Sequence, residues 1–436
     1  MPAMTELEID GSTLEGGGQV LRCCLSLAWL HEAPVRIHSI RAGRPKPGLA
    51  NQHLAGAQLT ATLSGVQLEG DTKGSTELLA SPGAPGVGPG PCSLVADAQT
   101  AGAATLILQA ALPPLLMRGS AATQLLLRGG TDVNFSPPTA HATMVLAPLL
   151  ARFGARLDVE VARRGFNPQG GGELRVTAGL LGERLRAVDL SERGDVREVR
   201  GLLVAPPGGA AAACALRDAL APRLREVAGL AGAEISLAIS RDLEAEIEAE
   251  ISTSRELADD AAGARGAEEP PAPAGGSGGG RGRGGGRGGG RGGGRGGGRG
   301  GGGRRRDVGV QLALTTDTGC VLSANLLQPL PPLDEAASQR AARALCDQVS
   351  ALLASGASVD EHTADQLIVY MALAEGTSKM RAPPADRLSS LHLPTALHFA
   401  ARMSGATFRL SEAADGCQLI ECDGIGAVAR AAGAAT

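Results

Sequence analysis

The stretch LEGGGQ occupies residues 14–19, and the related stretch NPQGGGE occupies residues 167–173. Glycine adopts positive φ values that residues with a Cβ rarely adopt at low cost, so each cluster predicts either a tight turn or a backbone that can approach an anion. The likeness of the two clusters also predicts a repeated supersecondary unit. The glycine pattern alone does not decide between the turn and the anion site.

Around these clusters the chain has the patterns of a mixed α and β protein. Short apolar runs alternate with glycine-rich turns and helix-like segments, such as residues 19–31, up to about residue 186. The later periodicity predicts a helix over residues 210–228, a strand with an acidic extension over 234–251, a strand from Val308, and helices over 334–353 and 361–375.

The composition limits the kind of core. The chain has 436 residues, 43% apolar and 20% charged, which is enough for two domains with a substantial core. It contains one Trp, one Tyr and five Phe. The core must therefore be aliphatic, and RNA binding by rows of stacked aromatic side chains is disfavoured.

A tract rich in glycine and arginine interrupts the chain. Residues 281–306 hold nine arginines and no acidic residue, so the other 410 residues carry 32 basic and 45 acidic side chains, a formal charge of −13 against −4 for the whole chain. Residues 261–306 cannot bury enough apolar surface to offset chain entropy, and they are predicted to be disordered. A sequence-tolerant RNA tether and a neutral loop expansion are both open interpretations.

Missing motifs exclude several classes of protein. Eight cysteines without a Cys-x-x-Cys pair indicate a reducing compartment. The N-terminus lacks a signal peptide, and no apolar run reaches the roughly 20 residues that span a bilayer, so we expect a soluble intracellular protein with no membrane partner. None of the three lysines stands in a Gly-Lys-Ser/Thr or a Lys-x-Asp-Gly sequence, which excludes a P-loop and a lysine-linked nucleotide.

A basic segment and a nearby carboxylate are candidates for phosphate chemistry. The segment IRAGRPKPGLANQH at residues 40–53 carries three cations and two stiffening prolines, and arginine forks bind phosphate oxygens bidentately. Arg22 adds a fourth cation close to the first glycine cluster. Glu15 is a candidate ligand for Mg²⁺, which takes one or two protein carboxylates. A solvated basic loop and a polar turn residue are the alternative interpretations.

Five motifs occur in one order along the chain: EGGGQVLR at 15–22, the segment 40–54, GGTD at 129–132, GFNPQGGG at 165–172 and DEHTADQL at 360–367. Together they resemble the RNA 3'-terminal phosphate cyclase family, its eukaryotic branch in particular, and the resemblance extends to the ending LIECDGIG at 419–426. The resemblance implies an α+β fold, with a large domain of repeated β/α units (cyclase/EPSP-synthase-like) and a smaller inserted α/β domain. We expect the large domain at 1–186 plus 329–436 and the insertion at 187–328.

The resemblance also implies an activity. Members of this family use ATP to convert an RNA 3'-terminal phosphate into a 2',3'-cyclic phosphate, through a covalent histidine-AMP intermediate and an adenylated RNA 3'-end. His392 matches the histidine nucleophile. The chemistry suits the residue, because a neutral imidazole has a free lone pair at cellular pH and forms a labile phosphoramidate. The implied location is the nucleus, with the cytosol as the alternative.

Further site residues follow from the resemblance. The expected ATP/AMP contacts are Gln109, Pro137, His362, Asp365 and Gln366. The expected contacts to the RNA terminal phosphate are Arg22, Arg41, Arg44 and Gln52, and Glu15 is expected to hold a divalent cation, Mg²⁺ or Mn²⁺. His362 and Asp365 lie three residues apart, hence on one helix face, where the ring can stack on adenine and the carboxylate can accept from ribose hydroxyls.

Two functions of other classes stay open. The first is a catalytically silent cyclase-like protein of ribosome assembly, and the presence of His392 argues against it. The second is an RNA-binding protein that works through the Arg/Gly tract.

Overall fold

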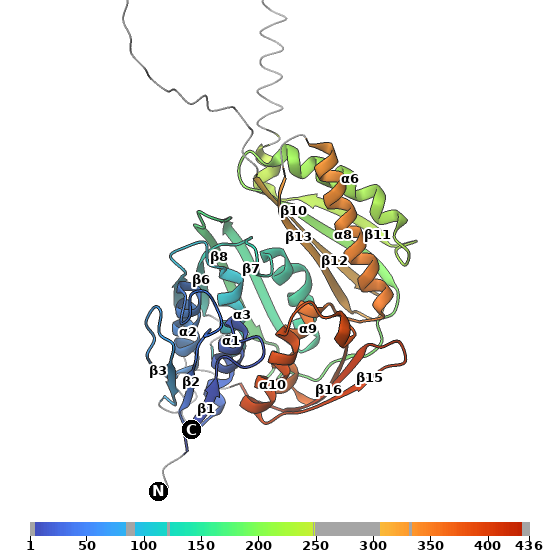
Figure 1. Cartoon of the computed structure of the whole chain (residues 1–436). Coiled ribbons are helices and arrows are strands. Elements are labelled where there is room, and N and C mark those ends of the chain that lie inside the picture. The colour runs from blue at the N-terminus through green and yellow to red at the C-terminus, as the bar shows by residue number, and fades with distance from the viewer. Residues whose placement is uncertain are drawn as a thin grey trace, which may run out of the picture.

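The computed structural model describes residues 5–83, 92–119, 123–246, 248, 306–330 and 334–429. Three four-stranded sheets with their helices form a large body, and a fourth sheet with two helices lies at one end of it (Figure 1).

The first unit shows the arrangement of strands and helices that the next two units repeat. Its elements are β1 (Leu7–Asp10), α1 (Gly18–Leu27), a 3-10 turn (Ala28–Leu30), β2 (Val35–His38), α2 (Asn51–Ser64), β3 (Gln67–Glu69) and β4 (Leu78–Ser81). The strands lie in the order β1-β2-β4-β3, with β1 and β2 parallel and the other neighbours antiparallel. Burial alternates along β2 and β4, as expected for strands with one face on the core.

The second unit repeats this topology. Its elements are β5 (Ser93–Asp97), α3 (Ala104–Arg118), β6 (Gln124–Gly129), α4 (Thr139–His141), a π-helical turn (Ala142–Leu146), α5 (Ala147–Arg152), β7 (Ala155–Arg163) and β8 (Gly172–Leu180). The strand order is β5-β6-β8-β7, again with the first pair parallel and the others antiparallel.

The third unit has the same topology but is split along the chain. Its elements are β9 (Asp189–Leu190), α9 (Glu361–Leu373), β14 (Glu375–Ala382), a 3-10 turn (Ala385–Arg387), α10 (His392–Ser404), β15 (Thr407–Glu412) and β16 (Gln418–Ile425). The strand order β9-β14-β16-β15 repeats that of the other two units. The remaining elements are therefore inserted between β9 and α9.

The insertion forms the fourth sheet. Its elements are β10 (Val196–Val204), α6 (Ala210–Glu226), β11 (Glu234–Ile239), β12 (Arg306–Thr316), β13 (Val321–Leu330) and α8 (Glu335–Ser355). The strand order is β11-β10-β12-β13, and α6 and α8 pack against each other on one side of the sheet (Figure 1). The expected α+β class, with repeated units and a smaller α/β insertion, is confirmed.

Buried apolar side chains form two clusters, one in the three repeated units and one in the insertion. The second cluster runs from Val196 to Leu353 and includes the buried face of α8. The predicted boundary at 328/329 assigned that helix to the larger unit, but its alanines and leucines face α6. The division into independently folding domains stays a prediction.

The two glycine clusters do not mark equivalent points of the repeat. Gly16 and Gly17 precede α1 in the turn after β1, whereas Gly170 and Gly171 lie in the connection between β7 and β8. Gly170 has a φ of 64°, and a Cβ there would lie 2.8 Å from the Cα of Ala101. The repeat was therefore correctly predicted, but from glycines that serve different turns.

The predicted elements have counterparts in the structure. The helices predicted from residues 19, 210, 334 and 361 correspond to α1, α6, α8 and α9, and the strands predicted from Glu234 and Val308 to β11 and β12. The predicted disorder over 261–306 lies outside the described residues, apart from Arg306 at the start of β12. Within the described ranges, no helix has both the length and the apolarity of a membrane span.

Phe399 tests how strongly α10 is anchored in the core. Its side chain is buried in the larger cluster. We expect Phe399→Ala to lower the free energy of unfolding by about 3–5 kcal/mol, because it removes a large buried ring and leaves a cavity. Leu410→Ala, at an exposed position of β15, should change it by no more than about 0.5 kcal/mol. Urea unfolding measures both, and equal losses would contradict the anchoring role.

Candidate active site

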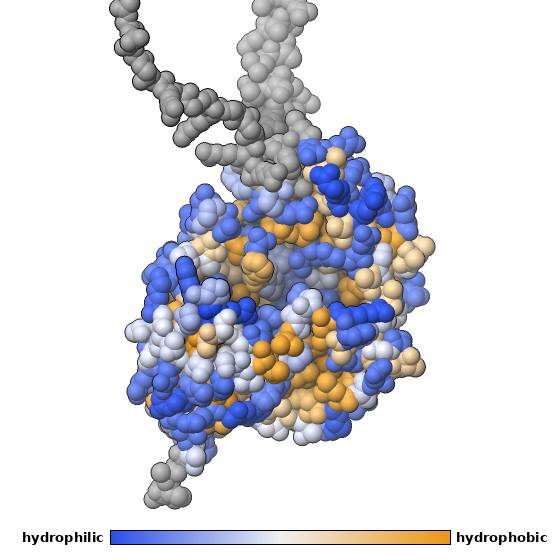
Figure 2. Space-filling model, in the orientation of Figure 1, coloured by the Kyte–Doolittle hydropathy of each residue, from blue (hydrophilic) through white to orange (hydrophobic). Residues whose placement is uncertain are grey.

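A pocket of about 350 Å³ lies where the N-termini of α9 and α10 meet α1 and the insertion, within the range of roughly 300–1,000 Å³ typical of small-molecule sites. Figure 2 shows a hollow between the insertion and the larger body, and the lining residues come from both sides of it. They are Gln19, Arg22, Leu106, Gln109, Phe135, Ser136, Pro137, His141, Asn325, His362, Asp365, Gln366, Ser390 and His392.

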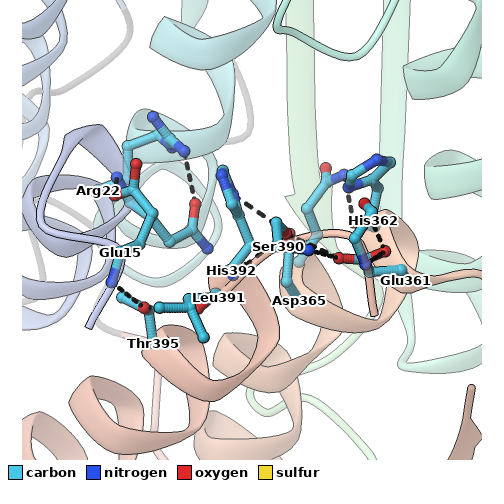
Figure 3. A network of polar contacts seen from close by, with 12 residues as sticks. Glu15, Arg22, Glu361, His362, Asp365, Ser390, Leu391, His392 and Thr395 are labelled. Atoms are coloured by element: carbon cyan, nitrogen blue, oxygen red, sulfur yellow. Dashed lines mark hydrogen bonds and ion pairs between the residues drawn. The ribbon is translucent and has the colours of Figure 1, made fainter. Parts of the chain in front are cut away.

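His392 lies between two groups of polar side chains, as Figure 3 shows, with Glu15 and Arg22 on one side and His362 and Asp365 on the other. Its Nδ1 is 3.7 Å from Oδ2 of Asp365, and its ring centroid is 6.5 Å from that of His362. Burial, and then the positive charge of Arg22, lower the pKa of His392. The imidazole is therefore neutral at pH 7, with a lone pair available for attack.

Asp365 is the carboxyl group among the residues that line the pocket, and 4% of the residue is exposed. Burial raises its pKa to about 7, although nearby His362 and Arg22 favour the charged form. A carboxyl group with this pKa changes its charge near neutral pH, which is typical of functional sites.

The start of α10 is held from two directions. Ser390 Oγ accepts a hydrogen bond from the backbone N–H of His392 at 3.3 Å. One turn into the helix, Thr395 Oγ1 accepts from the backbone N–H of Glu15 at 3.1 Å. The glycine-rich turn after β1 is thereby joined to the helix that carries His392 (Figure 3).

Beside the pocket, three arginines surround one carboxylate. Arg44 forms an ion pair with Glu15, whose other oxygen accepts from the backbone N–H of Gln19 at 3.3 Å. Arg22 is buried and donates to Gln19 Oε1 at 2.5 Å, while its Nε has no partner. Arg41 donates to the carbonyl of Gly48 at 2.7 Å. Three cations facing one carboxylate leave an excess of positive charge that favours an anionic ligand.

Gln52 and His53 support this cluster from the N-terminus of α2. Gln52 Oε1 accepts from the backbone N–H of Ala103 at 2.8 Å, so it fixes the start of α3. His53 is largely buried, and burial, with Arg41 and Arg22 nearby, lowers its pKa to about 3. It stays neutral and adds no charge to the cluster.

The structure brings most of the predicted site residues together. All five predicted nucleotide contacts line the pocket with His392 and Arg22. Glu15, Arg41, Arg44 and Gln52 are not among the lining residues and lie next to it on the Arg22 side.

Sequence reasoning missed several lining residues: Gln19, Phe135, Ser136, His141, Asn325 and Ser390. Phe135 is fully exposed and has a φ of 62°, two unfavourable features that indicate a role at the pocket. It follows the predicted GGTD turn, which was a usable signal. His141 is buried, and its Nε2 lies 3.1 Å from Thr363 Oγ1. Asn325 comes from β13 of the insertion, and a contact between the insertion and the larger body has no local signal in the sequence.

The side chains near Glu15 limit how the expected divalent cation could bind. No group of three or more His, Cys, Asp or Glu side chains suited to a metal occurs among the described residues. Mg²⁺ often binds through a single protein carboxylate, water and substrate phosphates, and Glu15 fits that pattern. Because Glu15 is paired with Arg44, a cation there would compete with the guanidinium for this carboxylate.

The fold and the pocket define an α+β protein with a small-molecule site that is lined by three histidines, among them the neutral His392, and that lies beside a cluster of arginines. The profile of the RNA 3'-terminal phosphate cyclase family matches residues 13–410. The chain is 32% identical over 420 residues to the RNA 3'-terminal phosphate cyclase of Pyrobaculum neutrophilum, with 96% of this chain and 99% of the relative covered. It is also 32% identical over 423 residues to that of Pyrobaculum aerophilum, covering 96% and 99%.

A third relative matches over part of the chain. The RNA 3'-terminal phosphate cyclase of Nostoc punctiforme is 43% identical over 199 residues, 45% of this chain and 57% of the relative. The chain therefore belongs to the RNA 3'-terminal phosphate cyclase family, which consists of ATP-dependent enzymes of the ligase class. The expected likeness to the eukaryotic branch stays a prediction.

The raised pKa of Asp365 has a consequence for stability. The folded state holds this proton up to about pH 7, whereas the unfolded chain releases it near pH 4. Its stabilising contribution is complete below pH 4 and is lost as the pH rises towards 7. We expect Asp365→Asn to gain roughly 3 kcal/mol relative to the wild type between pH 5 and pH 8, at about 1.4 kcal/mol per pH unit up to pH 7. Urea unfolding at both pH values tests this, and a constant difference would contradict it.

Proposed function

We propose that this protein uses ATP to convert RNA 3'-terminal phosphates into 2',3'-cyclic phosphates, with His392 as the nucleophile. The observation that carries the proposal is the position of His392, which lies in one pocket with Asp365 and His362 on one side and Arg22 on the other. Family membership supports RNA end cyclisation in general.

In the first step, the His392 imidazole attacks the α-phosphorus of ATP. The nitrogen–phosphorus bond forms, the bond to the bridging oxygen breaks, and pyrophosphate leaves with the electron pair. Asp365 lies on the Nδ1 side, so it favours the tautomer with a proton on Nδ1 and leaves the Nε2 lone pair free. The 3.7 Å separation is longer than a hydrogen bond and allows the pair to tighten when ATP binds.

His362, Pro137 and Gln366 are assigned to the nucleoside. His362 is exposed at the pocket wall, and Pro137 comes from the opposite loop, which Thr105 holds through a 2.8 Å hydrogen bond to the Pro137 carbonyl. These two flat side chains are suited to enclose an adenine ring. Gln109 and Arg22 lie near His392 in the same pocket and are assigned to the phosphates.

In the second step, an oxygen of the RNA 3'-phosphate attacks the phosphorus of the adenylated histidine: the new oxygen–phosphorus bond forms, the nitrogen–phosphorus bond breaks, and the His392 nitrogen regains its lone pair. Two anions must approach each other, and the Arg22, Arg41 and Arg44 cluster offsets their repulsion, with Gln52 aligning the end. The neighbouring 2'-hydroxyl then attacks the activated phosphorus, which closes the ring and expels AMP. Proximity favours this step because both groups belong to one ribose.

A divalent cation, Mg²⁺ or Mn²⁺, is assigned to Glu15. When bound it would neutralise charge on the ATP phosphates. Arg44 pairs with the same carboxylate, so a cation held by Glu15 would leave the Arg44 guanidinium available for the RNA phosphate.

The two alternative functions predict different outcomes. A silent assembly protein forms no covalent adenylate, and a protein that works through the Arg/Gly tract keeps its function without His392. Labelling with ATP separates both from the proposed enzyme.

We expect incubation with [α-³²P]ATP and Mg²⁺ to label the protein with AMP through a bond that is labile to acid and stable to base. His392→Ala should remove the label, since it removes the nucleophile. His398→Ala is the matched control, because His398 is an exposed histidine of the same helix, and it should be labelled like the wild type. A wild type that takes no label, or a label that survives in His392→Ala, would refute the assignment.

RNA with a 3'-phosphate on a terminal 2'-deoxyribose tests the order of the later steps. We expect the adenylated end to accumulate without cyclic product, because the attacking 2'-hydroxyl is missing. Thin-layer chromatography of digested product, beside the matching all-ribose RNA, measures both species. Release of AMP from the deoxy substrate at the all-ribose rate would contradict this order.

A further inference from the structure

Glu361 is the first residue of α9, and its neighbour His362 lines the pocket, yet Glu361 is not among the lining residues. Its carboxylate instead binds the two serines that precede α10. Oε2 accepts from the N–H and the hydroxyl of Ser389, each at 2.8 Å. Oε1 accepts from the N–H of Ser390 at 2.9 Å and from its hydroxyl at 2.7 Å.

This arrangement is more than a helix cap. The side chain of Asp360 already accepts from the backbone N–H groups of His362 and Thr363, at 3.1 and 3.0 Å. Glu361 is therefore free of that role, and all four of its hydrogen bonds go to a segment 28 or 29 residues away. Hydrogen bonds to a charged acceptor are stronger than neutral ones and geometrically more demanding.

The bound serines lead directly to His392. The Ser390 hydroxyl donates to Glu361 and accepts from the backbone N–H of His392 at 3.3 Å, so one oxygen links the carboxylate to the proposed nucleophile. On its other side, α10 is held to the glycine turn by Thr395 (Figure 3). The helix start that presents the imidazole is thus fixed between α9 and the turn after β1.

We propose that Glu361 is a positioning residue for histidine adenylation: by clamping Ser389 and Ser390 it sets the place of the His392 ring relative to the nucleotide held by α9. This inference rests on the proposed function. Misplacement of a reacting group by about 1 Å can cost on the order of 100-fold in rate, so a clamp of this kind is sufficient to control the step.

The full-length Glu361→Gln variant tests the clamp, because an amide keeps the shape but can accept at one oxygen only. We expect the rate of adenylation at saturating ATP to fall about 10- to 100-fold, while the KM for ATP changes less than about 3-fold. Cyclisation of RNA supplied with AMP already on its 3'-phosphate should change less than about 2-fold, since no bond to His392 forms in that step.

Variants of Ser389 test the hydrogen bonds of the clamp while the charge of Glu361 stays unchanged. It is exposed and does not line the pocket, so Ser389→Ala removes one clamp hydrogen bond and leaves the Glu361 charge in place. We expect Ser389→Ala to slow adenylation selectively and Ser389→Thr, which keeps the hydroxyl, to restore it. Glu375→Gln is the matched control, because that exposed carboxylate, just after α9, pairs with Arg184. It should behave like the wild type.

The outcomes distinguish this inference from the proposed function. Equal losses in adenylation and in cyclisation of pre-adenylated RNA would show a general structural role and overturn the clamp. Unchanged adenylation in both Glu361→Gln and Ser389→Ala, with a normally labelled wild type, would overturn the clamp alone. A wild type that forms no label would overturn the proposed function, and the clamp with it.

Discussion

Burial of ionisable side chains where α1, α9 and α10 meet is the constraint on which the site depends. A buried imidazole stays neutral and a buried carboxyl group keeps its proton to higher pH, and both effects occur here, in His392 and Asp365. A buried guanidinium cannot shed its charge in this way, so Arg22 remains a cation beside the His392 imidazole and the Asp365 carboxyl group. The pocket thus combines a neutral imidazole with a fixed positive charge, which suits the proposed attack on the α-phosphorus of ATP.

The repeated topology explains how residues so far apart in sequence come to share this pocket. Each unit places helices on one side of its sheet, and the inner helices α1, α3, α9 and α10 contact one another across the units. Arg22 comes from α1 of the first unit, Gln109 from α3 of the second and His392 from α10 of the third. The third unit closes around the pocket even though the insertion separates β9 from α9.

Local patterns predicted the elements well, and the motifs named residues that the structure brings together, although their roles stay predictions. Helices such as α6 and α9 follow from hydrophobic periodicity, and neighbouring residues such as His362 and Asp365 follow from helical spacing. Contacts between residues of different units could not be predicted from local sequence patterns. The Thr395 bond to the glycine turn spans 380 residues, and Asn325 enters the pocket from the insertion. The two similar glycine clusters predicted a repeat but not its boundaries, because glycine with a positive φ occurs in many kinds of turn.

Charge pairing in the ligand-free protein also bears on the order of binding. The charge of Glu15 acts on His392, and Glu15 forms an ion pair with Arg44, whose side chain is nearly half exposed. The Glu15 side chain is only 9% exposed, so its charge needs a partner, and the guanidinium can leave it at low cost only when another cation takes its place. In the proposed mechanism, Glu15 would then hold the cation on the nucleotide, and Arg44 would be available for the RNA phosphate. On the proposed assignments, nucleotide and cation would bind before RNA, because Arg44, the proposed RNA contact, is otherwise paired with Glu15.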